Sequence, residues 1–139
     1  MQMTEYGAPI ALAAAKKVLV AAEVEASANN WPVVIAVVDS TAHLVALHRM
    51  EHAQFGSIEA AQAKALTAVN FKRPTKAFAD TVAEGGNGMR LLSRENFCPL
   101  EGGIPLFAGG RIIGAIGVSG VLSAQDGQIA AAGARAVEG

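Results

Sequence analysis

The chain has 139 residues, of which 52% are hydrophobic and only 17% are charged, and its formal net charge is −1. This length is enough for one buried core, so we expect residues 1–139 to form a single domain. The near-neutral charge excludes the basic surface that nucleic-acid binding requires, and no apolar run approaches the length of a membrane span.

The first half of the chain predicts a helix, a hairpin and a second helix. Residues 9–30 are rich in alanine and leucine, with charged residues on one side, which is typical of an amphipathic helix. The apolar runs 32–40 and 44–50 are separated by the turn sequence STAH, and we expect them to pair as an antiparallel hairpin. Residues 57–71 predict a helix with Ser57 as its N-cap.

The region after residue 72 is less regular until a second hairpin begins. Residues 73–86 predict a short helix that stops at Gly85 and Gly86. Residues 85–101 predict a short helical turn and one short strand. Two apolar runs on either side of Gly109 and Gly110 indicate a hairpin over residues 104–120.

The last predicted element is a helix over residues 123–139. Ser123 is the expected N-cap, and Asp126 lies three residues further on, much as in a capping box. The order of elements is thus helix, hairpin, helices, hairpin, helix. Because hairpins require antiparallel pairing, the sequence predicts an α+β fold, an antiparallel sheet flanked by helices.

Glycines interrupt the predicted strand GRIIGAIGVSG, residues 110–120, at regular intervals. A dinucleotide fingerprint would need its glycines at a turn from strand to helix inside a parallel unit, and a Walker loop would need a lysine after glycine. Neither condition is met here. Two explanations stay open: the glycines let a helix pack tightly on the sheet, or they clear a surface for a flat ligand.

The sequence HRMEH, residues 48–52, matches the pattern of one group of zinc peptidases. That pattern works on a helix, whereas His48 completes a predicted strand and His52 enters a loop. No third ligand is evident. We therefore expect no metal site, with His48 and His52 as the weak candidates.

Lys64 stands out on the predicted helix 57–71, because it shares a face with small and apolar residues. Two interpretations stay open: the side chain extends along the surface to water, or its ammonium faces an anionic group in a cavity. Arg49 lies shortly before this helix. The two cations together could hold a carboxylate. The residues on the face are Ser57, Ala61, Lys64, Ala68 and Phe71.

Cysteine content and the N-terminus bear on location. Cys98 is the only cysteine, so an intramolecular disulfide is excluded and a reducing cytosol fits best. The first residues lack the basic segment of a signal peptide. The low content of charged residues leads us to expect self-association as a dimer or larger oligomer.

Four separated segments together resemble the GlcG/HbpS family of haem-binding or haem-degrading domains, which is also similar to the C-terminal domain of PduO-type proteins. These segments are VVIAVVDSTAHLVALHRMEHA, AAQAKALTAVNFKRPT, GGIPLF and IIGAIGVSGVLSAQD. The resemblance covers nearly the whole chain. It implies a profilin-like α+β fold, assembly into oligomers and, in some members, haem binding.

The resemblance also implies which residues form a ligand site. The matching positions that we expect there are Arg49, Lys64, Gly103, Gly117 and Ser119. Some haem-binding members supply a histidine from the first helix, whereas residues 9–30 contain none. Haem is therefore a candidate ligand for which we predict weak binding.

Two hypotheses about function follow. The first is a small oligomeric ligand-binding protein whose ligand is haem-like or a small carboxylated metabolite. The alternative is a small catabolic enzyme of the lyase, isomerase or hydrolase type, in which Arg49 and Lys64 hold the anion and stabilise developing negative charge.

Overall fold

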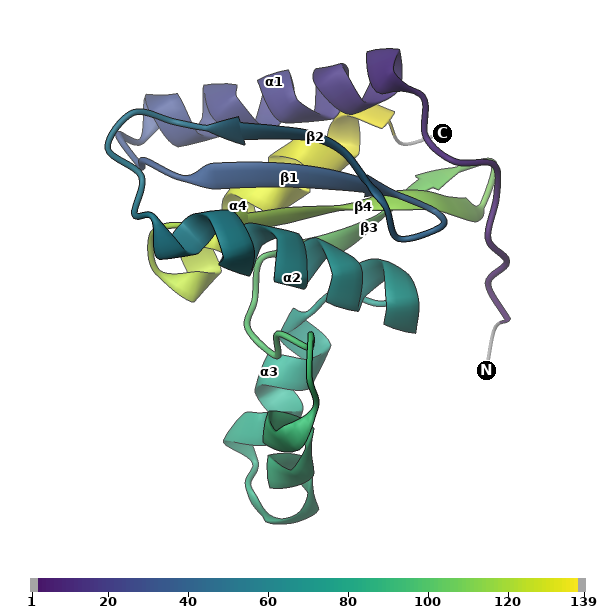
Figure 1. Cartoon of the computed structure of the whole chain (residues 1–139), viewed down its shortest axis with the longest axis vertical. Coiled ribbons are helices and arrows are strands. Elements are labelled where there is room, and N and C mark those ends of the chain that lie inside the picture. The colour runs from purple at the N-terminus through teal and green to yellow at the C-terminus, as the bar shows by residue number, and fades with distance from the viewer. Residues whose placement is uncertain (1–2, 138–139) are drawn as a thin grey trace.

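The computed structural model describes residues 3–137, and its centre is a four-stranded antiparallel sheet (Figure 1). The strand order is β2-β1-β4-β3, so the two hairpins lie side by side and join through β1 and β4. The hairpins are those predicted, and the antiparallel α+β fold is confirmed. The strands are β1 (Val34–Asp39), β2 (Leu44–Arg49), β3 (Gly103–Ala108) and β4 (Arg111–Ser119).

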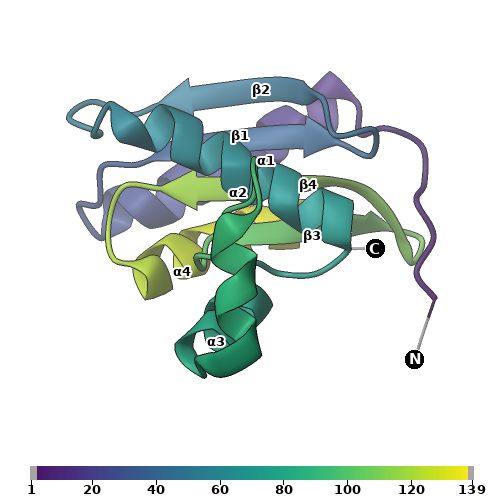
Figure 2. The same cartoon turned by 60° about the horizontal axis from the view of Figure 1, so that its bottom comes forward.

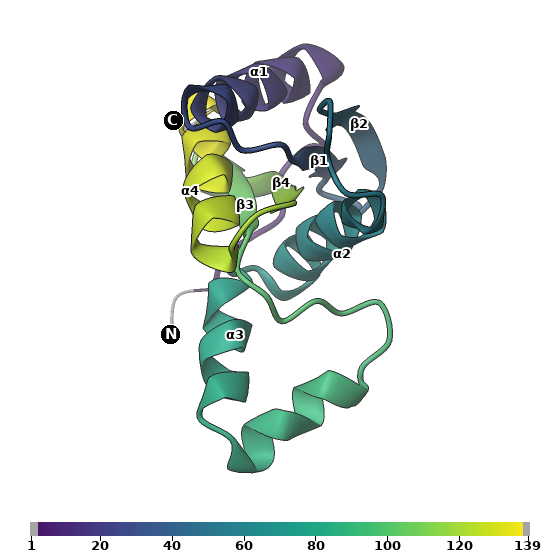
Figure 3. The same cartoon turned by 90° about the vertical axis from the view of Figure 1, so that its left-hand side faces the viewer.

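Helices cover both faces of the sheet (Figures 2 and 3). On one face lie α1 (Leu12–Ala28) and α4 (Ser123–Ala134), which also pack against each other, and α4 continues into the 3-10 turn η2 (Arg135–Val137). On the other face lies α2 (Gly56–Phe71), which contacts β1, β3 and β4. No helix among residues 3–137 is long and apolar enough to cross a membrane.

The central strand β1 shows why its sequence is apolar without alternation. Ile35 and Val37 of the strand, with Val33 just before it, point into the core under α1 and α4, whereas Val34 and Val38 point towards α2. All five are buried. A strand covered on both faces needs apolar residues at every position, which explains the continuous run.

The segment between α2 and β3 leaves the body of the molecule. It contains α3 (Lys76–Ala83) and the 3-10 helix η1 (Gly86–Ser93), joined at Gly85 and Gly86. Both glycines have positive φ angles of 74° and 59°, which other residues rarely adopt, and they end α3 as predicted. The helical turn predicted in residues 85–101 is η1, but the short strand predicted there is wrong, because this stretch has no sheet edge beside it.

Three predicted helix starts are wrong by one to three residues, and the first of them is α1, which begins at Leu12 where residue 9 was expected. The N-cap of α2 is Phe55, and Ser57 lies inside the helix, where its hydroxyl is buried. The N-cap of α4 is Leu122, whose backbone N–H donates to Oε1 of Gln125 at 3.2 Å. The last predicted helical residues, 138–139, lie outside the described residues.

Candidate functional site

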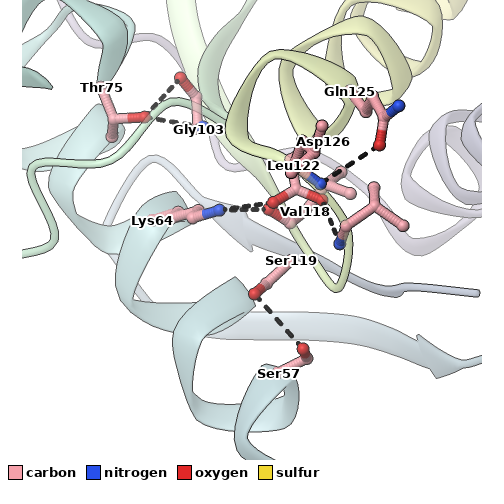
Figure 4. Close-up of polar contacts among 10 residues, drawn as sticks. Ser57, Lys64, Thr75, Gly103, Val118, Ser119, Leu122, Gln125 and Asp126 are labelled. Carbon is pink, nitrogen blue, oxygen red and sulfur yellow. Dashed lines mark hydrogen bonds and ion pairs between the residues drawn. The ribbon is translucent and has the colours of Figure 1, made fainter. Parts of the chain in front are cut away.

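Lys64 makes the most buried ion pair of the described chain, with Asp126 (Figure 4). Its Nζ lies 3.0 Å from Oδ2 of Asp126 and donates a second hydrogen bond of 2.9 Å to the backbone carbonyl of Val118. The two charged side chains are only 3% and 4% exposed. The interpretation in which Lys64 extends to water is therefore wrong. The ammonium does face an anionic group, and that group is a carboxylate of the protein itself.

Asp126 has more than the role at a helix start that its position suggested. Its second oxygen, Oδ1, accepts a 3.2 Å hydrogen bond from the backbone N–H of Val121. Burial raises the pKa of Asp126, while the nearby Lys64 ammonium and the backbone N–H groups of Val121 and Gly120 offset part of that rise. One carboxylate thus connects α4, the loop before it and α2. No spacing rule could reveal this pair, since its members lie 62 positions apart.

Gly103 and Gly117 face each other across β3 and β4, and both lie against α2. A Cβ atom on Gly117 would be 1.9 Å from the carbonyl oxygen of Ala61, and one on Gly103 would be 2.3 Å from that of Lys64. Real Cβ atoms do not approach oxygen so closely. Of the two explanations left open for the glycine-rich strand, tight helix packing accounts for Gly117. A ligand role for these two glycines stays a prediction.

Arg49 and Ser119 lie in one row across the sheet, on either side of Val34. Residues paired in this way share a face, and Val34 packs towards α2. Ser119 Oγ lies 3.4 Å from Oγ of Ser57, at the first turn of α2. Arg49 is exposed at the sheet edge. Within the described residues no hydrogen bond or ion pair connects Arg49 with Lys64, so the structure does not bring the two predicted anion-holding cations together.

Two hollows open at this end of the sheet, one on each side of the loop after β2. The first, of about 440 Å³, is lined by Gln54, Ser119, Gly120, Val121, Leu122 and Gln125. The second, of about 370 Å³, is lined by Ser27, Asn30, Trp31, Pro32, Met50, Glu51 and His52. Both volumes fall within the range of small-molecule sites. The sequence predicted Ser119 for such a site but gave no pattern for Trp31.

The histidines are spread over three environments. His48 Nδ1 pairs with Glu23 of α1, and His43 Nδ1 lies 2.8 Å from Oγ1 of Thr41. His52 is exposed and lines the smaller hollow. Among residues 3–137 no group of three or more histidine, cysteine or acidic side chains is placed to hold a metal ion.

Comparison with known proteins gives a consistent result. The family model described as haem degrading protein HbpS-like matches residues 10–135. Protein GlcG of Escherichia coli K12 is 41% identical over 105 residues, which cover 76% of this chain and 77% of GlcG.

Two solved structures have the same fold. HbpS is 32% identical and superimposes with a TM-score of 0.85, covering 100% of this chain and 94% of HbpS. The PduOC protein, solved as a haem complex, is 30% identical with a TM-score of 0.84, covering 94% of this chain and 96% of PduOC. The predicted resemblance is confirmed: this chain belongs to the HbpS-like family.

Proposed function

We propose that this protein binds haem or another flat, carboxylated small molecule in the hollow beside His52. One observation carries the proposal. A relative with 30% identity and the same fold over 94% of this chain, PduOC, has been solved as a haem complex. The description of the matching family, haem degrading protein HbpS-like, supports the same class of ligand.

The side chains around the smaller hollow fit haem chemically. Imidazole and thioether groups are axial ligands of haem iron in many proteins, and His52 and Met50 both line this hollow. Trp31 and Pro32 supply flat apolar walls. Bound haem would supply a redox-active iron, and His52 would hold it in place.

Arg49 is the cation that we assign to the carboxylates of the ligand. It precedes Met50 directly, it is exposed, and it has no ion-pair partner among residues 3–137. Ser119 lines the neighbouring hollow, so we assign it to a ligand that occupies that hollow and not to one beside His52. Lys64 is not included, since a ligand would have to displace Asp126 to reach its ammonium.

The proposal includes weak haem binding. The first helix, α1, has no histidine, so the family route to a second axial ligand is missing. We expect haemin titration to shift the Soret band without producing the sharp spectrum of bis-histidine haem.

The test is a haemin titration of wild type, His52→Ala and His43→Ala, followed by absorbance. We expect His52→Ala to lose the Soret shift and His43→Ala, the matched control on the β1–β2 turn, to keep it. Arg49→Gln should weaken binding roughly tenfold, because a charge-assisted contact contributes about 1.5–3 kcal/mol. A wild type that gives no Soret shift, or a His52→Ala variant that binds like wild type, contradicts the proposal.

Self-association and a reducing, cytosolic location belong to the same proposal. The support for the location is the single free cysteine, Cys98. The support for self-association is the apolar composition, with only 17% charged residues.

A further inference from the structure

A third hollow, larger than the two described above, lies on the side of the molecule where the N-terminal segment passes the end of α2 (Figures 1 and 2). Its volume is about 900 Å³, which is enough for a small-molecule ligand. The match to the family model begins only at residue 10, so one side of this hollow lies outside the region shared with the family. Among its lining residues are Thr4, Glu5, Tyr6, Phe71, Lys72 and Arg73.

Hydrogen bonds hold the N-terminal segment in place as one wall of this hollow. The backbone N–H of Gly7 donates to the carbonyl of Ile112 on β4 at 2.8 Å, and the N–H of Ile112 donates to the carbonyl of Glu5 at 3.0 Å. The hydroxyl of Tyr6 donates to the carbonyl of Val69 on α2 at 2.6 Å. The wall is thus formed before a ligand arrives, which reduces the ordering that binding must impose.

Lys72 and Arg73, at the end of α2, bring positive charge to the hollow. Both are exposed, and neither has an ion-pair partner among residues 3–137. Glu5, the acidic residue of the lining, pairs instead with Arg111 at 3.2 Å. Lys72 ends α2 with a left-handed backbone, at a φ angle of 57°, and its ammonium lies 4.7 Å from the centre of the Tyr6 ring. The hollow therefore combines two adjacent cations with an aromatic ring.

Cations at the end of a helix often serve only to bind its last carbonyl groups. Here the backbone N–H groups of Lys72 and Arg73 both donate to the carbonyl of Ala68. Of the Arg73 guanidinium, only Nε is used, in a 3.0 Å hydrogen bond to the carbonyl of Phe71. The ammonium of Lys72 donates to the carbonyl of Thr4 across the hollow, at 2.6 Å. Among residues 3–137, the two terminal nitrogens of Arg73 have no hydrogen-bond acceptor, so they are free for a ligand.

Tyr6 and Phe71 supply flat surfaces beside these cations. Tyr6 is 42% exposed, and Phe71 is half-buried. The ring of Phe71 is fixed edge to face by Phe78 and Phe97, at centroid distances of 5.6 Å and 5.3 Å, which come from the two ends of the projecting segment 76–101. Aromatic rings attract other planar groups in offset or edge-to-face arrangements. A planar ligand can thus contact these rings while its anionic group contacts the two cations.

We propose that this hollow binds a planar aromatic phosphate monoester, a ligand of roughly the size of a mononucleotide. A phosphate monoester carries close to two negative charges at neutral pH, which matches two adjacent cations. The free edge of the Arg73 guanidinium fits two phosphate oxygens, and the Lys72 ammonium adds a point charge. The hollow lies near Ile112 at the start of β4, whereas the proposed ligand site lies at the Ser119 end, so this inference does not depend on haem binding.

The chain has one tyrosine and one tryptophan, and each lines a different hollow. An NMR titration can therefore follow the ring signals of Tyr6 for this hollow and of Trp31 for the hollow beside His52. With naphthyl phosphate as the probe, we expect a saturable shift of the Tyr6 signals at concentrations that leave Trp31 unchanged. Naphthol, which has the ring without the charge, and inorganic phosphate, which has the charge without the ring, should each bind roughly tenfold or more weakly.

Variants test whether Arg73 binds the phosphate. Arg73→Gln should weaken the binding of naphthyl phosphate roughly tenfold or more, because a charge-assisted contact is lost. Arg73→Lys, which keeps the charge, should recover part of the affinity, as a merely misfolded hollow would not. Arg90→Gln, which removes another exposed arginine, from η1, is the matched control and should bind like wild type. A Tyr6 signal that does not move, a Trp31 signal that moves at the same or lower concentration, naphthol binding as tight as that of naphthyl phosphate, or Arg73→Gln binding like wild type would each overturn the inference.

Discussion

Two regions of the molecule place their helices in opposite ways. Helix α2 packs tightly against the sheet, whereas α3 and η1, in the arm at residues 76–101, project from the body of the molecule. Where α2 crosses Gly103 and Gly117, there is no room for even one added carbon atom. Along the arm, every residue is at least partly exposed. The first region is specified by steric exclusion inside one chain. The second is specified by an aromatic cluster at its base and by the close approach of Gly88 to Thr81, with most of its surface left exposed.

This difference predicts where the protein tolerates substitution. Where packing is tight, any added volume forces the backbone to move. One added methyl group between α2 and the sheet should therefore lower the stability of the fold. An exposed helical pair has space for most side chains, so substitutions on the arm should change stability little, except at Gly88, where an added Cβ would lie 2.2 Å from the carbonyl oxygen of Thr81.

The largest effect should come from Gly117→Ala. Its new Cβ would lie 1.9 Å from the carbonyl oxygen of Ala61 and 2.6 Å from the backbone nitrogen of Ala65, so α2 must move away from the sheet. We expect the free energy of unfolding to fall by more than about 4 kcal/mol, measured by urea denaturation.

The matched control for this variant is Gly56→Ala at the start of α2. A Cβ there has no neighbour within 4 Å. Since alanine favours helix more than glycine does, we expect a gain of up to about 1 kcal/mol. Equal effects of the two substitutions would show that steric exclusion does not specify the α2 contact.

The next largest effect should come from Lys64→Met, which removes one member of the buried pair with Asp126. The carboxylate would remain buried without its cation, at a cost of about 3 kcal/mol near neutral pH. Replacing both residues, as Lys64→Met with Asp126→Leu, should recover most of that loss, because no buried charge is left. A double variant no more stable than Lys64→Met contradicts the pairing as the cause.

The pKa of Asp126 also predicts the direction in which the stability of Lys64→Met changes with pH. Burial already raises the pKa of Asp126 in the folded protein, and loss of Lys64 removes a group that lowers it. A carboxyl whose pKa is higher in the folded state than in the unfolded state binds a proton more tightly when folded, so stability rises as the pH falls. The deficit of Lys64→Met against wild type should therefore shrink from neutral pH towards the ordinary aspartate pKa of 3.8.

A smaller effect is expected for Leu92→Ala on the arm. At low protein concentration, the free energy of unfolding should change by less than about 0.5 kcal/mol, because Leu92 packs against little in its own chain. A loss above about 1 kcal/mol in the dilute sample would show that the arm contributes to the stability of the monomer.

The sequence was sufficient for the parts of the fold that local physics determines. The unbroken apolar run of β1 and the Gly109-Gly110 turn predicted the two hairpins, and the stripe on residues 57–71 predicted α2. Periodicity and turn preference are properties of neighbouring residues, so one chain is enough to recognise them. The exact helix starts were missed, since an exposed residue such as Leu122 can serve where serine was expected.

The site was harder to predict because it depends on distant residues. Lys64 was recognised as out of place on an alanine face, but its partner Asp126 could not be identified from spacing. Arg49 and Ser119 were predicted separately, and only the register of three strands shows that they share a row. The arm gave no sequence signal, since its composition does not show that it stands apart from the core.

The smallest effect that we predict concerns Cys98, where the arm returns to the body. Its backbone N–H donates to Oγ1 of Thr67 on α2 at 2.9 Å, and burial raises the pKa of its thiol despite the nearby Lys64 ammonium. A raised pKa leaves less thiolate at pH 8, so a disulfide reagent should label Cys98 about tenfold or more slowly than in the urea-unfolded chain.

The urea dependence of the same reaction tells whether the arm opens by itself. If its base detaches locally, the labelling rate should change little with urea below the unfolding transition, because local opening exposes little surface. A rate that increases steeply with urea would mean that Cys98 is reached only by global unfolding. The arm would then be as firmly held as the α2 contact, and the contrast between the two regions would be one of exposure alone, without a difference in stability.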